Sequence, residues 1–295
     1  MATINANVTA QMAANALAKN NRTMTQTMER LATGARINSA SDDAAGLAIS
    51  SKMTSQIRGL NQAVRNGNDA IAMLQTADGA AIEITNMLQR MREISVQGST
   101  GTLSSGYNGD RSALNAEFVA LRAEIERIAD NTQWNGDNLL DGTSGDYGNL
   151  TFQVGYEANQ TITVNIGDWN LAAFAHGSAW ITETVANDVY GLDISANGPT
   201  TRVLANSFLP DFDTAIAGVD AQRAIIGSAI NTLEFAVDSL SNASQNASQA
   251  RSRVADADYA LETTELARTQ IIAQAATAML SQANQQALSV LALLK

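Results

Sequence analysis

The chain has 295 residues, with 18 Lys and Arg against 29 Asp and Glu, and a formal net charge of −11. That acidity argues against a nucleic-acid partner, because neutralising phosphates requires clustered Lys and Arg. The absence of cysteine excludes disulfides and thiol chemistry. The one histidine, His176, excludes His-paired metal sites and leaves little room for catalysis by histidine. We therefore expect no cofactor and no metal.

Both ends of the chain are helix-forming but almost free of charge. Ala2–Ala18 and Thr269–Leu294 contain no charged side chain. A helix without a charged face is usually covered on every side. Polar residues such as Gln270 and Gln282 make the second segment a poor membrane span, so other protein is the expected cover. The N-terminus has no basic segment followed by an apolar one, so we expect no cleaved secretory signal.

A long helix is predicted from Ala44 to about Gly98. Ser39, Ser41, Asp42 and Asp43 supply an N-cap and acids at its start. Its predicted apolar seam follows a heptad through Ile57, Leu60, Val64, Gly67, Ile71, Leu74, Asp78, Ala81, Thr85 and Leu88. Four glycines lie inside this predicted helix: Gly46, Gly59, Gly67 and Gly79. Each could be a tolerated surface residue, or could allow the backbone of a neighbouring helix to approach closely, and both interpretations remain open.

A third helix is predicted through Leu114, Phe118, Leu121, Ile125 and Ile128. Asn135–Gly136 and Asp141–Gly142 then break the chain. Residues 150–154 and 161–166 alternate apolar and polar side chains across a short connection, which predicts a β-hairpin. The pattern is lost from Gly167 to about Leu209, and the two prolines lie within this segment and directly after it, at Pro199 and Pro210.

The last arm carries the longest heptad. It runs through Phe212, Ile216, Val219, Arg223, Ile226, Ile230, Leu233, Val237, Leu240, Ser244, Ala247, Arg251 and Val254. Spacing of 3.5 residues sustained over this length is a coiled-coil signal, because a narrow apolar seam must face a partner helix. The natural partner is the first arm folded back antiparallel, which makes a helical bundle. Asp256 and Asp258 are expected to cap the final helix.

Two groups of segments resemble bacterial flagellins. RINSASDDAAGLAI at 36–49 and QIRGLNQAVR at 56–65 are similar to the amino-terminal region of that family. SRVADAD at 252–258, ATAMLSQANQQ at 276–286 and SVLALL at 289–294 are similar to its carboxy-terminal region. The resemblance covers about residues 1–140 and 210–295.

The resemblance implies a mainly α fold, an antiparallel helical hairpin and coiled-coil bundle with a small β-hairpin and a short irregular outer excursion. Residues 1–45 with 257–295 would form inner-tube terminal helices that are disordered in the monomer. Residues 46–166 with 211–256 would form the outer-tube coiled-coil domain that includes the hairpin. Residues 167–210 would form a short, surface-exposed variable region, smaller than in many flagellins.

The resemblance implies a structural subunit, not an enzyme. It would be exported unfolded by the flagellar type III apparatus and would self-assemble into the extracellular flagellar filament for swimming motility, through coupled folding of its termini. Partners by family analogy are other copies of the chain, an export chaperone, the junction and cap proteins, and Toll-like receptor 5 in animals. No nucleic acid and no membrane insertion are expected.

The resemblance also assigns residues. The polymerisation residues of the terminal helices would be Ile4, Val8, Leu17, Met24, Met28, Leu31, Ile271, Ala275, Met279, Leu288 and Leu291. An intersubunit motif would comprise Arg36, Asn38, Asp42 and Asp43. The receptor surface would comprise Gln89, Arg90, Glu93, Ile94 and Glu117, with Met91 and Ser95 departing from the commonest pattern. The alternative for this surface is packing between neighbouring protofilaments.

Single residues suggest other functions. Asp42 and Asp43 could serve acid–base chemistry, but a helix cap within a family motif is the preferred interpretation. A His-Glu-x-x-His metalloprotease site needs two histidines. Sugar binding by Trp169 and Trp180 competes with local core packing, and Ser178, Thr182 and Thr184 are candidate O-glycan acceptors. The alternative structural function is a hook–filament junction protein, which shares similar helical ends.

Overall fold

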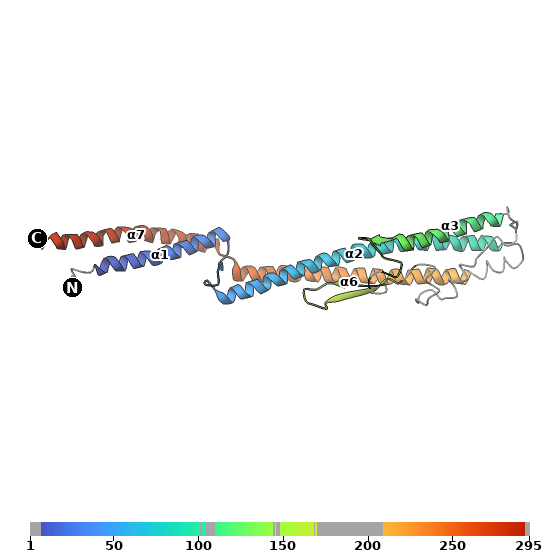
Figure 1. The fold of residues 1–295 in the computed structure, drawn as a ribbon, viewed down its shortest axis with the longest axis horizontal. Coiled ribbons are helices and arrows are strands. Elements are labelled where there is room, and N and C mark those ends of the chain that lie inside the picture. Colours follow the sequence, from blue (N-terminus) through green and yellow to red (C-terminus); the bar gives the residue numbers. More distant parts are fainter. Residues whose placement is uncertain are drawn as a thin grey trace. The chain divides into compact units, whose positions relative to one another are not determined.

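The structure is a computed structural model that describes residues 7–100, 102–103, 110–143, 145, 148–167, 169 and 209–292, with side chains as far as residue 285. The described chain is mainly α-helical, as predicted (Figure 1). Its helices are α1 (Val8–Thr33), α2 (Ala44–Ser99), α3 (Asp110–Asn131), α6 (Leu209–Ala255) and α7 (Tyr259–Ala292). Its strands are β1 (Gln133–Trp134), β2 (Asp137–Asn138), β3 (Asn149–Gln153) and β4 (Thr161–Asn165).

The chain divides into two compact units. One comprises residues 59–243, and the other comprises residues 1–58 with 244–295. The predicted boundaries at 45/46 and 256/257 lie close to the breaks between helices, whereas the compact units divide within α2 and α6. Most of the predicted excursion, residues 170–208, lies outside the described residues.

Unit 59–243 is built around an antiparallel pair formed by α2 and α6. Asp78 of α2 meets Arg223 of α6, with 2.9 Å between Oδ1 and Nε. Farther along α2, Arg92 meets Asp213, nearer the start of α6, at 2.6 Å. Asp78 and Arg223 are the polar interruptions of the two predicted seams, and the structure pairs them with each other.

Three positions of each predicted heptad lie one residue away from the buried position. The α2 seam buries Leu60, Gly67, Leu74, Ala81 and Leu88 as predicted. Its alternate positions are Ala63, Ala70 and Ala77, and the predicted Val64, Ile71 and Asp78 are half-buried beside them. In α6, Ala215, Gln222 and Ala229 are buried where Ile216, Arg223 and Ile230 were predicted. Small side chains occupy the contact because they let the helices approach closely.

The glycines of α2 show how closely neighbouring groups approach this helix. A Cβ added to Gly67 would lie 2.5 Å from Val237 Cγ2, and one added to Gly59 would lie 2.7 Å from Tyr156 Cβ. A Cβ on Gly46 would lie 2.5 Å from atoms of both Asp43 and Ile37. Gly79 faces open space. Gly59 and Gly67 therefore require glycine for space, the side-chain ends beside Gly46 could move aside, and Gly79 is the tolerated surface glycine.

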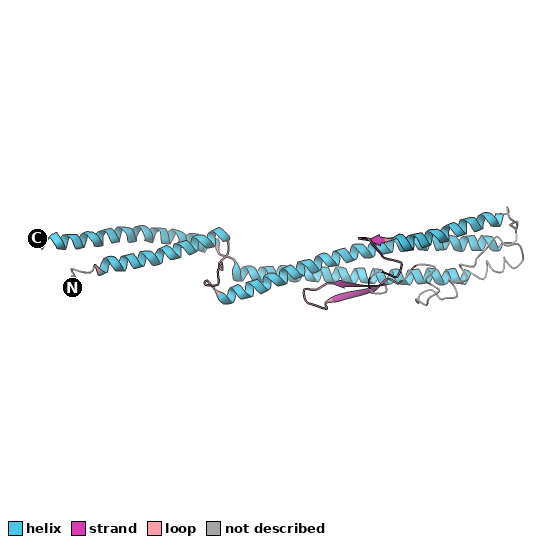
Figure 2. Cartoon of the chain, in the orientation of Figure 1, coloured by secondary structure: helices cyan, strands magenta, loops and turns pink. Residues whose placement is uncertain are grey.

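The third helix and the hairpins complete this core. Phe118 of α3 packs edge-to-face on Phe212 of α6, with ring centroids 6.0 Å apart. β3 and β4 form the predicted antiparallel hairpin, with Leu150 opposite Val164 (Figure 2). Trp169 is 1% exposed, and its Nε1 donates to the Ile166 carbonyl at 2.6 Å. Trp169 is therefore a core residue and is not available for sugar binding.

A second hairpin was missed by sequence reasoning. β1 and β2 pair across Asn135–Gly136, which both have positive φ, 53° and 94°. Such values are those of the two-residue hairpin turn for which Asn-Gly is the strongest sequence signal. From the sequence, the dipeptide predicts only a break in the chain. The flanking strands are two residues long, which is too short to show an alternating pattern.

Candidate assembly interface

In the other unit, α1 and α7 lie side by side and antiparallel (Figure 1). Asn7 Nδ2 donates to the Ala283 carbonyl at 3.2 Å, and Asn20 Nδ2 donates to the Thr269 carbonyl at 2.8 Å. At the other end of the pair, the Tyr259 hydroxyl donates to the carbonyl of Leu31 at 2.9 Å. These contacts join residues at opposite ends of the sequence into one helical hairpin.

A heptad of buried and half-buried residues runs along each of these helices. In α1 it is Ala10, Ala13, Leu17, Asn20, Met24, Thr27 and Leu31, and in α7 it is Glu262, Leu266, Thr269, Ala273, Ala276, Leu280 and Ala283. Among the side chains described for the pair, the fully buried ones are all polar: Thr27, Glu262 and Thr269. The pair therefore encloses no complete apolar core of its own.

The large apolar side chains of this pair lie on the outside. Met12 and Ile271 are each 67% exposed, and Met279 is 66% exposed. Of the predicted polymerisation residues, Val8, Met28, Ile271, Ala275 and Met279 are exposed, and Leu17, Met24 and Leu31 are half-buried in the α1–α7 seam. Ile4 and the side chains of Leu288 and Leu291 lie outside the described residues. An outward apolar surface of this kind marks a site for another protein.

The segments that connect the terminal helices to α2 and α6 are joined to each other. Ala35 and Asp256 form an antiparallel bridge, in which the Arg36 amide donates to the Ala255 carbonyl at 2.7 Å. Arg36 Nη2 also donates to the carbonyl of Val254 at 2.8 Å, and Asn38 Nδ2 donates to that of Ala35 at 3.0 Å. These two residues of the predicted intersubunit motif therefore hold the fold of one subunit.

Asp42 organises the turn that precedes α2. Its Oδ2 accepts from the Ser39 amide at 2.9 Å and from the Asn38 amide at 3.1 Å, and its Oδ1 accepts from Gln26 Nε2 of α1 at 2.7 Å. The hydrogen bonds from Ser39, Asn38 and Gln26 hold the pKa of Asp42 below its usual value, because they favour the charged carboxylate. Asp42 is thus committed to structure and is not poised for acid–base chemistry.

The neighbouring carboxylates include the helix caps. Asp43 Oδ1 accepts from the Gly46 amide at 2.9 Å, which caps α2 as predicted. Asp258 Oδ1 accepts from the Ala260 amide at 2.9 Å and caps α7. Asp256, which was also expected to cap that helix, instead lies in the bridge with Ala35.

The predicted receptor surface lies on α2 and α3. Arg90 Nε lies 2.7 Å from Glu117 Oε1, and Arg90 Nη1 lies 3.0 Å from Glu93 Oε2. The hydrogen bonds that Arg90 donates to Glu117 and Glu93 raise the pKa of Arg90. Gln89 is also exposed, but Ile94 is fully buried, since its side chain points into the helical core. The inclusion of Ile94 in an exposed surface is therefore wrong.

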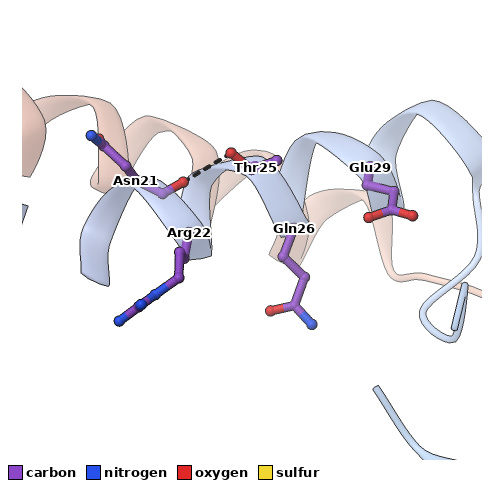
Figure 3. A pocket seen from close by; sticks show the side chains of 5 residues that line it. All are labelled: Asn21, Arg22, Thr25, Gln26 and Glu29. Carbon is purple, nitrogen blue, oxygen red and sulfur yellow. Dashed lines mark hydrogen bonds between the residues drawn. The ribbon is translucent and has the colours of Figure 1, made fainter. Parts of the chain in front are cut away.

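A pocket of about 360 Å³ lies along α1, lined by Asn21, Arg22, Thr25, Gln26 and Glu29 (Figure 3). Four of these residues are exposed, and Thr25 donates to the carbonyl of Asn21 at 3.0 Å. A nucleophile paired with a general base is not found among these side chains. The pocket is a surface depression and provides no catalytic arrangement.

Within the described part of the chain, no group of acidic, histidine or cysteine side chains is placed to hold a metal ion. None of the described helices is long and apolar enough to cross a membrane. The remaining candidates from the sequence, His176, Ser178, Trp180, Thr182 and Thr184, lie outside the described residues.

Sequence reasoning missed the heptads of α1 and α7. The signal was present in the seven-residue spacing of Leu17, Met24 and Leu31, and of Leu266, Ala273 and Leu280. Polar and alanine residues at the alternate positions concealed it. The Arg30–Glu262 contact, at 3.1 Å between Nη1 and Oε1, was missed because the two residues are far apart in the sequence.

Comparison with known proteins places these helices in a family. Residues 4–145 match the family model of the bacterial flagellin N-terminal helical region, and residues 209–294 match that of the flagellin C-terminal helical region. The flagellin of Bacillus subtilis (strain 168) is 41% identical over 304 residues, which cover 99% of each chain. The flagellin of Halalkalibacterium halodurans is 43% identical over 268 residues, covering 91% of this chain and 90% of the relative.

The fold alone is shared more widely. The solved structure of a protein assigned as flagellar hook-associated, from Vibrio parahaemolyticus, has a TM-score of 0.61 and 18% identity, and it covers 73% of this chain and all of its own. The end-to-end identity to flagellins is more specific than that likeness of fold. The chain therefore belongs to the bacterial flagellins, the structural subunits of the flagellar filament.

Proposed function

We propose that this flagellin builds the extracellular filament by burying the outer faces of α1 and α7 against other copies of itself. The observation that supports the proposal is the inverted burial of this helix pair. Thr27, Glu262 and Thr269 are buried inside it, whereas Met12, Ile271 and Met279 face outward. Covering these apolar side chains with neighbouring copies would remove their surface from water, which is the main favourable term in association.

The same burial supports coupled folding and polymerisation. Ordering α1 and α7 costs conformational entropy for every residue, and a seam without a fully buried apolar side chain offsets little of that cost. Neighbouring copies would supply the missing burial. In this proposal the termini are disordered in the free chain, become helical on joining the filament, and form its inner tube, while unit 59–243 is already folded.

Export and partner proteins follow from family analogy. The chain would leave the cell unfolded through the flagellar type III apparatus, accompanied by an export chaperone, and would grow between the junction and cap proteins. Binding of Toll-like receptor 5 is proposed at Gln89, Arg90, Glu93 and Glu117, the exposed members of the predicted surface. Their role within the filament would be contact between protofilaments. The proposed role is structural throughout and involves no catalysis.

The alternative, a hook–filament junction protein, has the same kind of helical ends but would assemble only as a short ring. Identities of 41% and 43%, over 99% and 90% of the length of two flagellins, favour the filament subunit. The two functions differ in the length of the polymer, which a direct assay can measure.

The test is seeded polymerisation of the purified full chain, with negative-stain electron microscopy. Long, uniform, hollow filaments are expected. Chains lacking residues 1–35 or 260–295 should form none, yet should retain helical circular dichroism with a cooperative melting transition, because unit 59–243 keeps its core. Short rings from the full chain would favour the junction protein. Normal filaments from either truncated chain would contradict the assembly role of α1 and α7.

A further inference from the structure

We infer that the Arg30–Glu262 ion pair fixes the register in which α1 and α7 pair, and thereby selects the one hairpin from which filaments grow. The inference rests on the proposed function, because it names the contact that makes the assembling helices adopt one arrangement.

The apolar part of the α1–α7 seam does not define a register by itself. Leu17, Met24 and Leu31 recur every seven residues in α1, and Leu266, Ala273 and Leu280 do so in α7. Sliding one helix past the other by a heptad therefore places apolar residues opposite apolar residues again. A seam with this repetition pairs nearly as well in the shifted arrangement, and a polar residue is the usual device that removes the ambiguity.

Most polar contacts of the pair would survive the same slip. Asn7 and Asn20 donate to the main-chain carbonyls of Ala283 and Thr269, and Tyr259 donates to that of Leu31. Carbonyl groups recur at every residue of a helix, so a shifted helix offers the same kind of acceptor. These hydrogen bonds hold the helices together but carry little information about register.

The Arg30–Glu262 pair is different because both partners are charged side chains. Nη1 and Oε1 are 3.1 Å apart, and the Glu262 side chain is 6% exposed while that of Arg30 is 26% exposed. A carboxylate at this depth is costly unless a cation accompanies it. The structure therefore places this register-dependent side-chain contact at the end of the pair that is nearest to the linkers, where the Ala35–Asp256 backbone bridge supports the same register.

A shift of one heptad would separate these charges. Arg30 would face Thr269 in one direction of slip, and Glu262 would face Thr23 in the other, since these residues lie seven positions away. Glu262 would then be buried beside a hydroxyl group. Breaking a buried charge pair costs more than the pair contributes, because it leaves a desolvated charge without compensation. The penalty applies to the shifted hairpin and not to the native one.

Charge exchange in the full chain tests the inference. Arg30→Glu and Glu262→Arg alone should each slow seeded filament elongation by about tenfold or more, since each places like charges together at a buried site. The double variant Arg30→Glu with Glu262→Arg should return to within about threefold of the parent, because the opposite charges meet again. The matched control is the exposed pair Glu265–Arg268 on the same helix, at 3.1 Å, whose exchange should have little effect.

Disulfide cross-linking between introduced cysteines measures the register directly. The chain has no cysteine of its own that could form competing disulfides. Asn20→Cys with Thr269→Cys reports the native register, and Asn20→Cys with Ala276→Cys reports a shift of one heptad. In a stabilising osmolyte that favours the helical state of the termini, oxidation of the parent background should give the intramolecular cross-link for the 20–269 pair alone. In the Arg30→Glu background both pairs should cross-link, and in the double-exchange background the 20–269 pair should dominate again.

The outcomes separate the two proposals. Single exchanges that elongate like the parent and cross-link only the 20–269 pair would overturn the register inference, as would a double exchange that restores neither readout. Failure of the parent chain to form filaments would contradict the proposed function. The cross-linking measurement does not require filament growth, so it would still test the register inference in that case. The quantity compared is the yield of each cross-link in the single-exchange and double-exchange variants, in a stabilising osmolyte.

Discussion

The α2–α6 pair and the α1–α7 pair share a seven-residue repeat but bury opposite kinds of residue. The first seam buries Leu74, Ala77 and Ile226 completely. The second completely buries only Thr27, Glu262 and Thr269 among its described side chains. Burial of apolar surface drives folding, at about 25 cal/mol per Å². The comparison therefore separates a helix pair that buries an apolar core from one that, among its described side chains, does not.

The repeat and its occupants carry different information. A heptad locates the seam on a helix, whatever residues fill it. The occupants decide whether the seam is self-sufficient. In unit 59–243 the seam is further covered by α3 and the β3–β4 hairpin, through Phe118 and Leu150. In the α1–α7 pair, large apolar side chains such as Ile271 remain exposed.

The largest expected effect is on the self-sufficient core. Phe212→Ala should lower the free energy of unfolding of the full chain by about 3–5 kcal/mol, because Phe212 is fully buried. The matched control is Phe235→Ala on the same helix, where the side chain is 77% exposed and the change should stay within about 0.5 kcal/mol. Urea unfolding followed by circular dichroism measures both. Equal effects would contradict the burial of the α2–α6 seam.

The next effect concerns the pair that depends on assembly. Ile271→Gln should raise the critical concentration for polymerisation by about tenfold to a hundredfold, because burying the exposed isoleucine would contribute about 1.5–3 kcal/mol. Unfolding of unit 59–243 should not change. Thr263→Gln, at an exposed polar position of α7, is the control and should polymerise as the parent does. Sedimentation of filaments at increasing protein concentration measures the difference. An unchanged critical concentration would remove Ile271 from the interface.

Glycine substitutions sharpen the comparison within one helix. Gly67→Ala should destabilise the chain by about 1–3 kcal/mol, because the new methyl group would lie 2.5 Å from Val237 Cγ2. Gly79→Ala should instead stabilise it by about 0.5–1 kcal/mol, because Gly79 faces open space and alanine favours the helix. Thermal unfolding should move in opposite directions for the two variants. A stabilising Gly67→Ala would mean that α2 and α6 do not approach closely there.

The smallest effect is the pH dependence of the turn before α2. The pKa of Asp42 is lower in the folded state than in the unfolded chain, so its contribution to stability is present above the unfolded pKa and is lost as pH falls through the folded pKa. Asp42→Asn should therefore flatten the acid limb of filament stability between about pH 5 and pH 2.

Thermal disassembly of filaments at a series of pH values checks this prediction. Asp69→Asn, at an exposed position of α2, serves as the control and should keep the acid limb of the parent. An acid limb that is unaltered by Asp42→Asn would show that the hydrogen bonds from Ser39, Asn38 and Gln26 do not depend on the charge.

The amino-acid sequence by itself determined the helices, the β3–β4 hairpin, the family and the approximate location of the α2 and α6 seams. These features depend on local periodicity and on cap residues such as Asp43 and Asp258, which act over a few neighbours. Membership of the flagellins was evident from segments at both ends. The exposure of Val8, Met28, Ile271 and Met279 was likewise foreseeable, because uncharged helices need a cover.

Only the tertiary structure decided which side of each seam is buried. Val64, Ile71 and Ile216 are better hydrophobic residues than the alanines beside them, yet Ala63, Ala70 and Ala215 occupy the contact. The physical reason is that seam choice depends on how closely the partner approaches, which is a property of both helices together. The same holds for Ile94, which lies in the core, and for Arg30 and Glu262, whose contact joins residues from opposite ends of the chain.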